Sequence, residues 1–175
     1  MAKKQQTTRR TAQRKFSKHQ PARFDLARIL VPIDFSEHSK KALEYAVPFA
    51  RQFGASLELL YVVEPTIYPA DFSFGQVGFP NVEEELRTRG YHELEGLITK
   101  TIGGRVKARA SVRTGKAFFE IDQFAQEQGI GLIIIATHGH TGIEHVLFGS
   151  TAEKVIRHAP CPVLVIPAAG KKFVR

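Results

Sequence analysis

The sequence has 175 residues, 43% of them hydrophobic, and a formal net charge of +8. A chain of this length can bury a sizeable core and most often folds as one domain. No apolar run approaches the roughly 20 residues that a membrane helix needs, and a single cysteine excludes an internal disulfide framework and fits a reducing compartment. We therefore expect a cytoplasmic protein without membrane insertion.

The positive charge is concentrated at the start of the chain. Residues 1–24 hold eight Lys and Arg residues and no acid, whereas the rest of the chain has 17 basic and 17 acidic residues. So polar a segment cannot bury enough apolar surface to offset its ordering entropy, which predicts a disordered extension. A solvated extension is the simplest interpretation, with binding to nucleic acid or anionic lipid, or organelle import, as alternatives.

The remaining chain alternates between strand patterns and helix patterns. The run LARILVPI over residues 26–33 indicates a buried strand. Ser36 is suited to cap a helix over residues 37–53. Pro48 lies inside that helix and predicts a kink or a local break. A second buried strand follows over residues 56–63.

The next part of the chain is the least regular. Residues 64–80 are rich in proline, glycine and aromatic residues, which predicts a long loop that could cover a site. Asn81, with Glu84 three residues later, has the pattern of a capping box. We expect a helix over residues 82–102 that ends at a glycine pair.

Residues 105–113 alternate between small apolar and polar side chains, which predicts a strand with one solvated face near a sheet edge. A helix is expected over residues 116–128. Lys116 and Glu120, at its start, are interpreted as surface residues.

The last strand–helix–strand unit contains a glycine-bearing loop. Residues 132–136 form an apolar run, residues 150–159 have a helix pattern, and Pro162 to Ile166 predict a final strand. Cys161 is interpreted as a buried structural thiol.

Five strands alternating with helices predict an α/β fold, a doubly wound parallel sheet with helices on both faces. Ligands of such sheets lie beyond the carboxyl ends of the strands, at the point where the strand order reverses. The loops expected there comprise residues 32–36, 62–65, 114–117 and 137–151.

The loop after residue 136 carries the strongest chemical signal. Its glycines, Gly139, Gly142 and Gly149, allow backbone N–H groups to approach a ligand closely. Ser150 and Thr151 open the following helix, whose positive end favours an anion, and both are suited to cap it. The pattern predicts a phosphate site, and Asp34, after the first strand, is expected to face it.

Other chemistries are less well supported. His138, His140 and His145 cluster in the loop, but their spacing favours roles other than metal binding. Lys154, one turn into the helix, is interpreted as solvated. The sequence has no P-loop motif and no nucleophile elbow, and it nominates no catalytic residue.

Three segments together resemble the universal stress proteins, over about residues 27–167. They read ILVPIDFSEHSKKALEYA, VRTGKAFFEIDQFAQEQGIGLIIIATHG and ATHGHTGIEHVLFGSTAEKVIRHAPCPVLVIP. The resemblance implies a Rossmann-like fold with the five-stranded sheet in the order 3-2-1-4-5. The nucleotide-binding members carry G-x2-G-x9-G-[S/T], which falls here on Ala136, Gly139, Gly149 and Ser150, with Ala136 in place of the first glycine.

The resemblance also implies the site. Asp34 would contact the adenosine moiety, the backbone near Pro32 and Val62 would line the adenine pocket, and the glycine loop would hold ribose and phosphates. The implied nucleotide-binding residues are Pro32, Asp34, Val62, Ala136, Gly139, His140, Thr141, Gly142, Gly149, Ser150 and Thr151. The implied ligand is ATP, with or without Mg²⁺, and the implied assembly is a homodimer formed through Pro162 to Ile166.

We therefore expect a universal stress domain over residues 25–168, between the basic extension 1–24 and a basic tail 169–175. The leading hypothesis is an ATP-binding, dimeric stress-response module with at most slow ATP hydrolysis. The alternative, supported by Ala136, is a dimer that does not bind ATP and acts through protein–protein interaction. Nucleic-acid binding by the extension is a weaker hypothesis.

Overall fold

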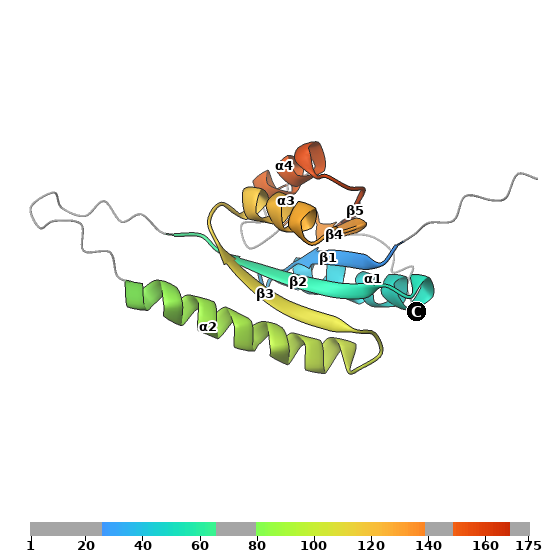
Figure 1. Ribbon diagram of the computed structural model, residues 1–175, viewed down its shortest axis with the longest axis horizontal. Helices are drawn as coiled ribbons and strands as arrows, with labels where there is room; N and C mark the ends of the chain where they lie inside the picture. The colour runs from blue at the N-terminus through green and yellow to red at the C-terminus, as the bar shows by residue number, and fades with distance from the viewer. Residues whose placement is uncertain (1–25, 66–79, 139–148, 169–175) are drawn as a thin grey trace, which may run out of the picture.

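The computed structural model describes residues 26–65, 80–138 and 149–168. Their strands form one five-stranded parallel sheet in the order β3-β2-β1-β4-β5, which confirms the predicted fold (Figure 1). No described helix has the length and apolar character needed to cross a bilayer. The strands are β1 (Arg28–Pro32), β2 (Ser56–Val63), β3 (Ala108–Thr114), β4 (Leu132–Ala136) and β5 (Val163–Ile166), and the helices are α1 (Glu37–Phe53), α2 (Pro80–Leu97), α3 (Ala117–Glu127) and α4 (Ser150–His158).

The sheet is packed between two pairs of helices. Helices α1 and α2 cover one face, and α3 and α4 cover the other (Figure 1). Because side chains alternate along a strand, Ile29 and Val31 of β1 enter the core beside α1, whereas Leu30 enters the core beside α3. All three are completely buried. The strand order reverses between β1 and β4, so their carboxyl ends form the switch point at which a ligand is expected.

Helix α1 begins where the sequence predicted and runs unbroken through Pro48, so the predicted local break is wrong. A proline removes one helical hydrogen bond, but tertiary packing can hold the helix across it. Val47, directly before the proline, and Ala50, two residues after it, are both buried against the core. At the end of the helix, Gly54 has a φ of 70°, the left-handed conformation that favours glycine.

Helix α2 begins earlier than expected. It starts at Pro80, so Asn81 lies inside its first turn and the prediction of Asn81 as the capping residue is wrong. Proline suits a first helical position because its fixed φ is helical and the N–H it lacks would have had no helical partner. The helix continues into a π-helical turn, η1 (Ile98–Ile102), which ends at Gly103. Most of the predicted covering loop, residues 66–79, lies outside the described residues.

The edge position of β3 is confirmed, but the strand begins at Ala108 rather than Arg105. Arg105 is tied to the preceding turn, because its backbone N–H donates to the carbonyl of Ile102 at 3.1 Å. Strands β1 and β5 are also shorter than predicted.

Two predicted environments differ in the structure. The Glu120 side chain is only 14% exposed and lies 4.0 Å from Arg113 Nη1, so its interpretation as a surface residue is wrong. It packs against Gly115, where a Cβ would lie 2.7 Å from Glu120 Oε1. Cys161 is half-buried rather than fully buried, and this burial raises the pKa of its thiol.

Candidate functional site

A cavity of about 340 Å³ lies at the carboxyl ends of β1, β2 and β4, at the predicted switch point. Its size lies in the range of small-molecule sites. The cavity brings together every predicted nucleotide-binding residue that the structure describes. These lining residues are Pro32, Asp34, Val62, Ala136, Gly149, Ser150 and Thr151. The other four, Gly139, His140, Thr141 and Gly142, lie outside the described residues.

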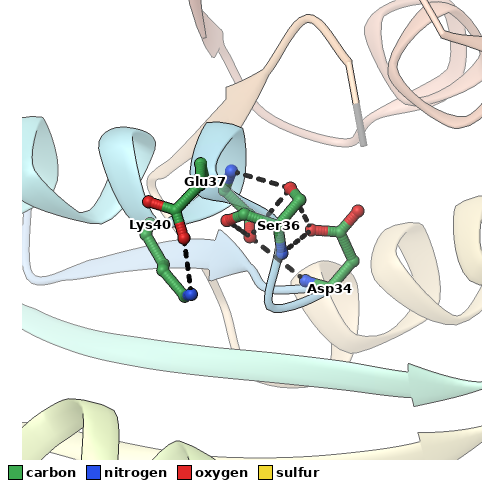
Figure 2. A network of polar contacts seen from close by, with 5 residues as sticks. Asp34, Ser36, Glu37 and Lys40 are labelled. Atoms are coloured by element: carbon green, nitrogen blue, oxygen red, sulfur yellow. Dashed lines mark hydrogen bonds and ion pairs between the residues drawn. The ribbon is translucent and has the colours of Figure 1, made fainter. Parts of the chain in front are cut away.

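Asp34 is held at the cavity wall by the start of α1. Its Oδ1 atom accepts hydrogen bonds from the Ser36 backbone N–H at 3.0 Å and from Ser36 Oγ at 2.6 Å (Figure 2). Ser36 Oγ in turn accepts from the Ser39 backbone N–H at 3.2 Å, which is the predicted helix cap. One serine hydroxyl therefore fixes both the carboxylate and the helix.

Phe35, between Asp34 and Ser36, has a strained backbone. Its φ is 65°, a left-handed conformation that costs a non-glycine residue about 1–2 kcal/mol. The Phe35 ring packs on Tyr61, with the ring centroids 4.8 Å apart. Tyr61 lines the cavity, and burial, followed by the nearby Glu93 carboxylate, raises the pKa of its phenol. No sequence pattern indicated this aromatic pair, because its two residues lie near the ends of different strands and 26 positions apart.

One edge of the Tyr61 ring meets helix α2 at Gly90. A Cβ at Gly90 would lie 2.4 Å from Tyr61 Cδ1, closer than any side chain allows. Gly90 therefore lets the helix approach the ring directly. Phe35, Tyr61 and Gly90 form a continuous packed contact from the cavity wall to α2.

The start of α4 forms a second wall of the cavity. Gly149 occupies the capping position and donates its N–H to the Thr137 carbonyl at 2.7 Å. Ser150 and Thr151 are already helical, and no described side chain caps the helix, so their predicted capping role is wrong. A helix start without a side-chain cap presents N–H groups and a positive dipole end, which suit an anion.

Ala136, which replaces the family's first glycine, is the last residue of β4. It is 7% exposed, and its Cα pairs with that of Ile166 on β5. It belongs to the core cluster beside α1, whereas its neighbour Ile135 belongs to the opposite cluster. The residue therefore contributes to core packing as well as to the cavity wall.

Sequence reasoning missed Glu64, which follows β2 and also lines the cavity. Its Oε1 atom accepts a hydrogen bond from the Ala117 backbone N–H at 2.9 Å and so caps α3, whose own capping residue, Lys116, provides no side-chain bond. The two residues are 53 positions apart, so no local pattern could show the contact. The described lining thus has two carboxylates, Asp34 and Glu64, and neither Lys nor Arg.

His138 is the only member of the predicted histidine cluster within the described residues. It lines the cavity, with Nδ1 3.0 Å from Thr137 Oγ1 and its ring centroid 6.3 Å from that of His38. Within the described ranges, no three His, Cys, Asp or Glu side chains are placed to hold a metal ion. Lys154 is exposed, with its ammonium 4.8 Å from the centroid of the Phe118 ring.

Comparison with known proteins gives the family. The model of the universal stress protein family matches residues 26–167, nearly the whole described fold. The chain belongs to the universal stress protein family. Universal stress protein MJ0531 of Methanocaldococcus jannaschii is 32% identical over 148 residues, which cover 83% of this chain and 84% of that protein.

Solved universal stress proteins share the fold. UspA from Lactobacillus plantarum superposes with a TM-score of 0.69 and 28% identity, covering 83% of this chain and 99% of that one. The structure of MJ0577 superposes with a TM-score of 0.70 and 26% identity, and the match covers 83% of this chain and 98% of that one. Two further structures, a universal stress protein in complex with cAMP and one from Archaeoglobus fulgidus in complex with dAMP, are each 18% identical, with TM-scores of 0.59 and 0.56. Each match covers 82% of this chain, with 98% of the solved chain covered in the cAMP complex and 99% in the dAMP complex.

Proposed function

We propose that this universal stress protein binds an adenine nucleotide, ATP, in the cavity at the switch point and acts as a cytoplasmic stress-response module. One observation carries the proposal. A single cavity collects residues from the ends of β1, β2 and β4 and from the start of α4, at the positions to which the family resemblance assigns the nucleotide. The proposed role is one of binding, with at most slow ATP hydrolysis.

Each part of the ligand has a complementary wall in this proposal. The adenine ring would pack near Pro32 and Val62, and Asp34 would contact the adenosine moiety. The phosphates would lie at the start of α4, where backbone N–H groups and the helix dipole favour negative charge. Residues 139–142 would complete the phosphate site.

Gly149 suits a close approach of backbone and ligand. A Cβ built at this position would make an ordinary contact, 3.4 Å from the Thr137 carbonyl oxygen, so the described part of the chain does not itself require glycine there. Mg²⁺ bound to the phosphates would offset the charge of the two lining carboxylates. The cAMP and dAMP complexes support an adenine nucleotide only through a shared fold, so the ligand class rests on the cavity itself.

Calorimetry with ATP, with and without Mg²⁺, tests this function. ATP at a free concentration of about 100 times its Kd would stabilise the folded protein by about 2.7 kcal/mol, which a thermal melt detects. Asp34→Asn keeps the acceptor atom for the Ser36 bonds and should weaken ATP at least about tenfold. The matched control is Asp122→Asn on α3, outside the cavity. Absence of binding and of any melting shift in the wild type would contradict the proposal.

The alternative is a dimer that does not bind ATP and acts through protein–protein contacts. It is favoured by Ala136, whose methyl group stands where the nucleotide-binding pattern has glycine. The variant Ala136→Gly separates the two functions. If ATP binds only to the variant, the alternative is correct, and if it binds the wild type equally well, the methyl group is harmless.

We also propose that β5 forms the homodimer interface, through Pro162 to Ile166. This strand is at the edge of the described sheet, and it bonds to β4 through the carbonyls of Pro162 and Ile166. Since bonding alternates along a strand, the N–H of Val165 points to the open edge. Val165→Pro should therefore yield a monomer by light scattering with an unchanged circular dichroism spectrum. A persistent dimer would place the interface elsewhere.

A further inference from the structure

A second groove, of about 600 Å³, follows the outer strand β3 between α2 and α3. It lies at the side of the sheet, and no lining residue is shared with the nucleotide cavity within the described part of the chain. Its size is that of a small-molecule site. The residues that matter here are Glu58, Arg87, Tyr91, Arg109, Arg113 and Phe124.

Glu58 is an unusual residue at the floor of this groove. It lies within β2, on the sheet face that points toward α3, and is 6% exposed. Among residues 26–65, 80–138 and 149–168, no hydrogen bond or ion pair reaches its carboxylate. Burial raises the pKa of Glu58, and the positive charges of Arg109 and Arg28 partly oppose this shift. The carboxylate oxygens are not among the described buried atoms that lack a partner, so they remain reachable from the groove and can accept from a ligand that supplies donors.

Arg109 provides the opposite charge. It is the direct neighbour of Glu58 across the strands, and side chains paired in this way share one face of the sheet. Their Cα atoms are therefore only about 4.8 Å apart. Arg109 is exposed and has no ion-pair partner within 4.0 Å in the described ranges.

The other two arginines of the groove are already engaged. Arg87 Nε lies 3.7 Å from Glu84 Oε2, and Arg113 pairs with Glu127. The groove therefore offers a carboxylate and a guanidinium side by side, which attract each other through space but form no ion pair within 4.0 Å in the described ranges. The exposed ring of Tyr91 borders them, whereas Phe124 is buried, with the Arg113 guanidinium carbon 5.5 Å from its ring centroid.

We infer that this groove binds a small zwitterion of the α-amino-acid class, with Glu58 accepting from its ammonium group and Arg109 donating to its carboxylate. The ammonium supplies the donors that the buried carboxylate lacks. A guanidinium binds a carboxylate through two parallel hydrogen bonds. An apolar side chain on the ligand packs against the exposed ring of Tyr91. The inference is independent of nucleotide binding.

Three related probes test whether the groove recognises both the ammonium and the carboxylate of the ligand. L-leucine carries both groups, 4-methylpentanoate lacks the ammonium, and 3-methylbutylamine lacks the carboxylate. Titration calorimetry on the full chain should show leucine binding at least about tenfold more tightly than either partial probe. Equal affinity for one partial probe, or no leucine binding up to its solubility limit, overturns the inference.

Two variants assign the binding to this groove. Glu58→Gln keeps the side-chain size and removes a buried charge, so folding is preserved, and Arg109→Gln removes the guanidinium. Each variant should lower the affinity for leucine at least about tenfold and leave the affinity for ATP unchanged. Lys107→Gln, one charge removed just before β3 and outside the groove, is the matched control and should bind leucine as the wild type does. Leucine binding that survives both groove substitutions refutes the site.

Discussion

Replacing Ser36 by alanine should destabilise the protein more than an average serine substitution. The Ser36 hydroxyl accepts from the Ser39 N–H and donates to Asp34 Oδ1 at 2.6 Å. Loss of a helix cap costs about 1 kcal/mol, and loss of a hydrogen bond to a charged group costs about 1.5–3 kcal/mol. Asp34 Oδ1 keeps its bond from the Ser36 N–H, so we take the second loss as about 1 kcal/mol, the net value of an ordinary hydrogen bond. We expect a total loss of about 2 kcal/mol.

Urea denaturation followed by circular dichroism measures this loss. In a chain of this size, about 2 kcal/mol corresponds to a melting temperature lower by roughly 4–8 °C. Ser150→Ala is the matched control because Ser150 is exposed and Gly149, not Ser150, occupies the capping position of α4. That control should change stability by less than about 0.5 kcal/mol. Equal losses in the two variants would refute the capping argument.

Two further predictions concern packing and pH. Gly90→Ala places a Cβ against Tyr61 and should destabilise the protein by about 1–3 kcal/mol. Gly96→Ala on the same helix meets open space and should stabilise the protein by about 0.5–1 kcal/mol. Thermal melts of the two variants compare these effects, and equal effects would contradict the contact between Gly90 and Tyr61. Because burial raises the folded-state pKa of Glu58, the folded protein keeps this carboxyl protonated to a higher pH than the unfolded chain does. Ionisation of Glu58 therefore lowers the free energy of unfolding as the pH rises above the unfolded-state pKa. Glu58→Gln should therefore gain stability over the wild type at neutral pH and not in acid, as urea titrations at both pH values would show.

The fold was predictable because its signals are local. Strands β2 and β4 match the apolar runs 56–63 and 132–136, since each run is short and turn residues bound it. Ser36 was recognised as a cap because a serine before a helical pattern has few other roles. Strand order, by contrast, came from family resemblance and not from the pattern.

The parts of the site that could not be predicted depend on contacts between distant residues. Glu64 caps a helix that begins 53 positions later, and Glu120 is covered by its packing around Gly115. The capping of α4 was assigned to the wrong residues because serine and threonine are common caps, whereas the chain is already helical at Ser150. Of the predicted binding residues, those of the cavity wall are brought together, and their role in nucleotide binding stays a prediction.

The contact of Phe35, Tyr61 and Gly90 has a consequence for how this sequence can diverge. The aromatic ring at position 61 fills the space that a side chain at position 90 would need. A larger residue at position 90 is therefore compatible only with a smaller one at position 61, so the two positions must change together. The left-handed backbone at position 35 adds a third constraint, since glycine would relieve the strain there but remove the ring that packs on Tyr61. Substitutions at Tyr61 in the cavity wall therefore depend on the residue at position 90 of helix α2.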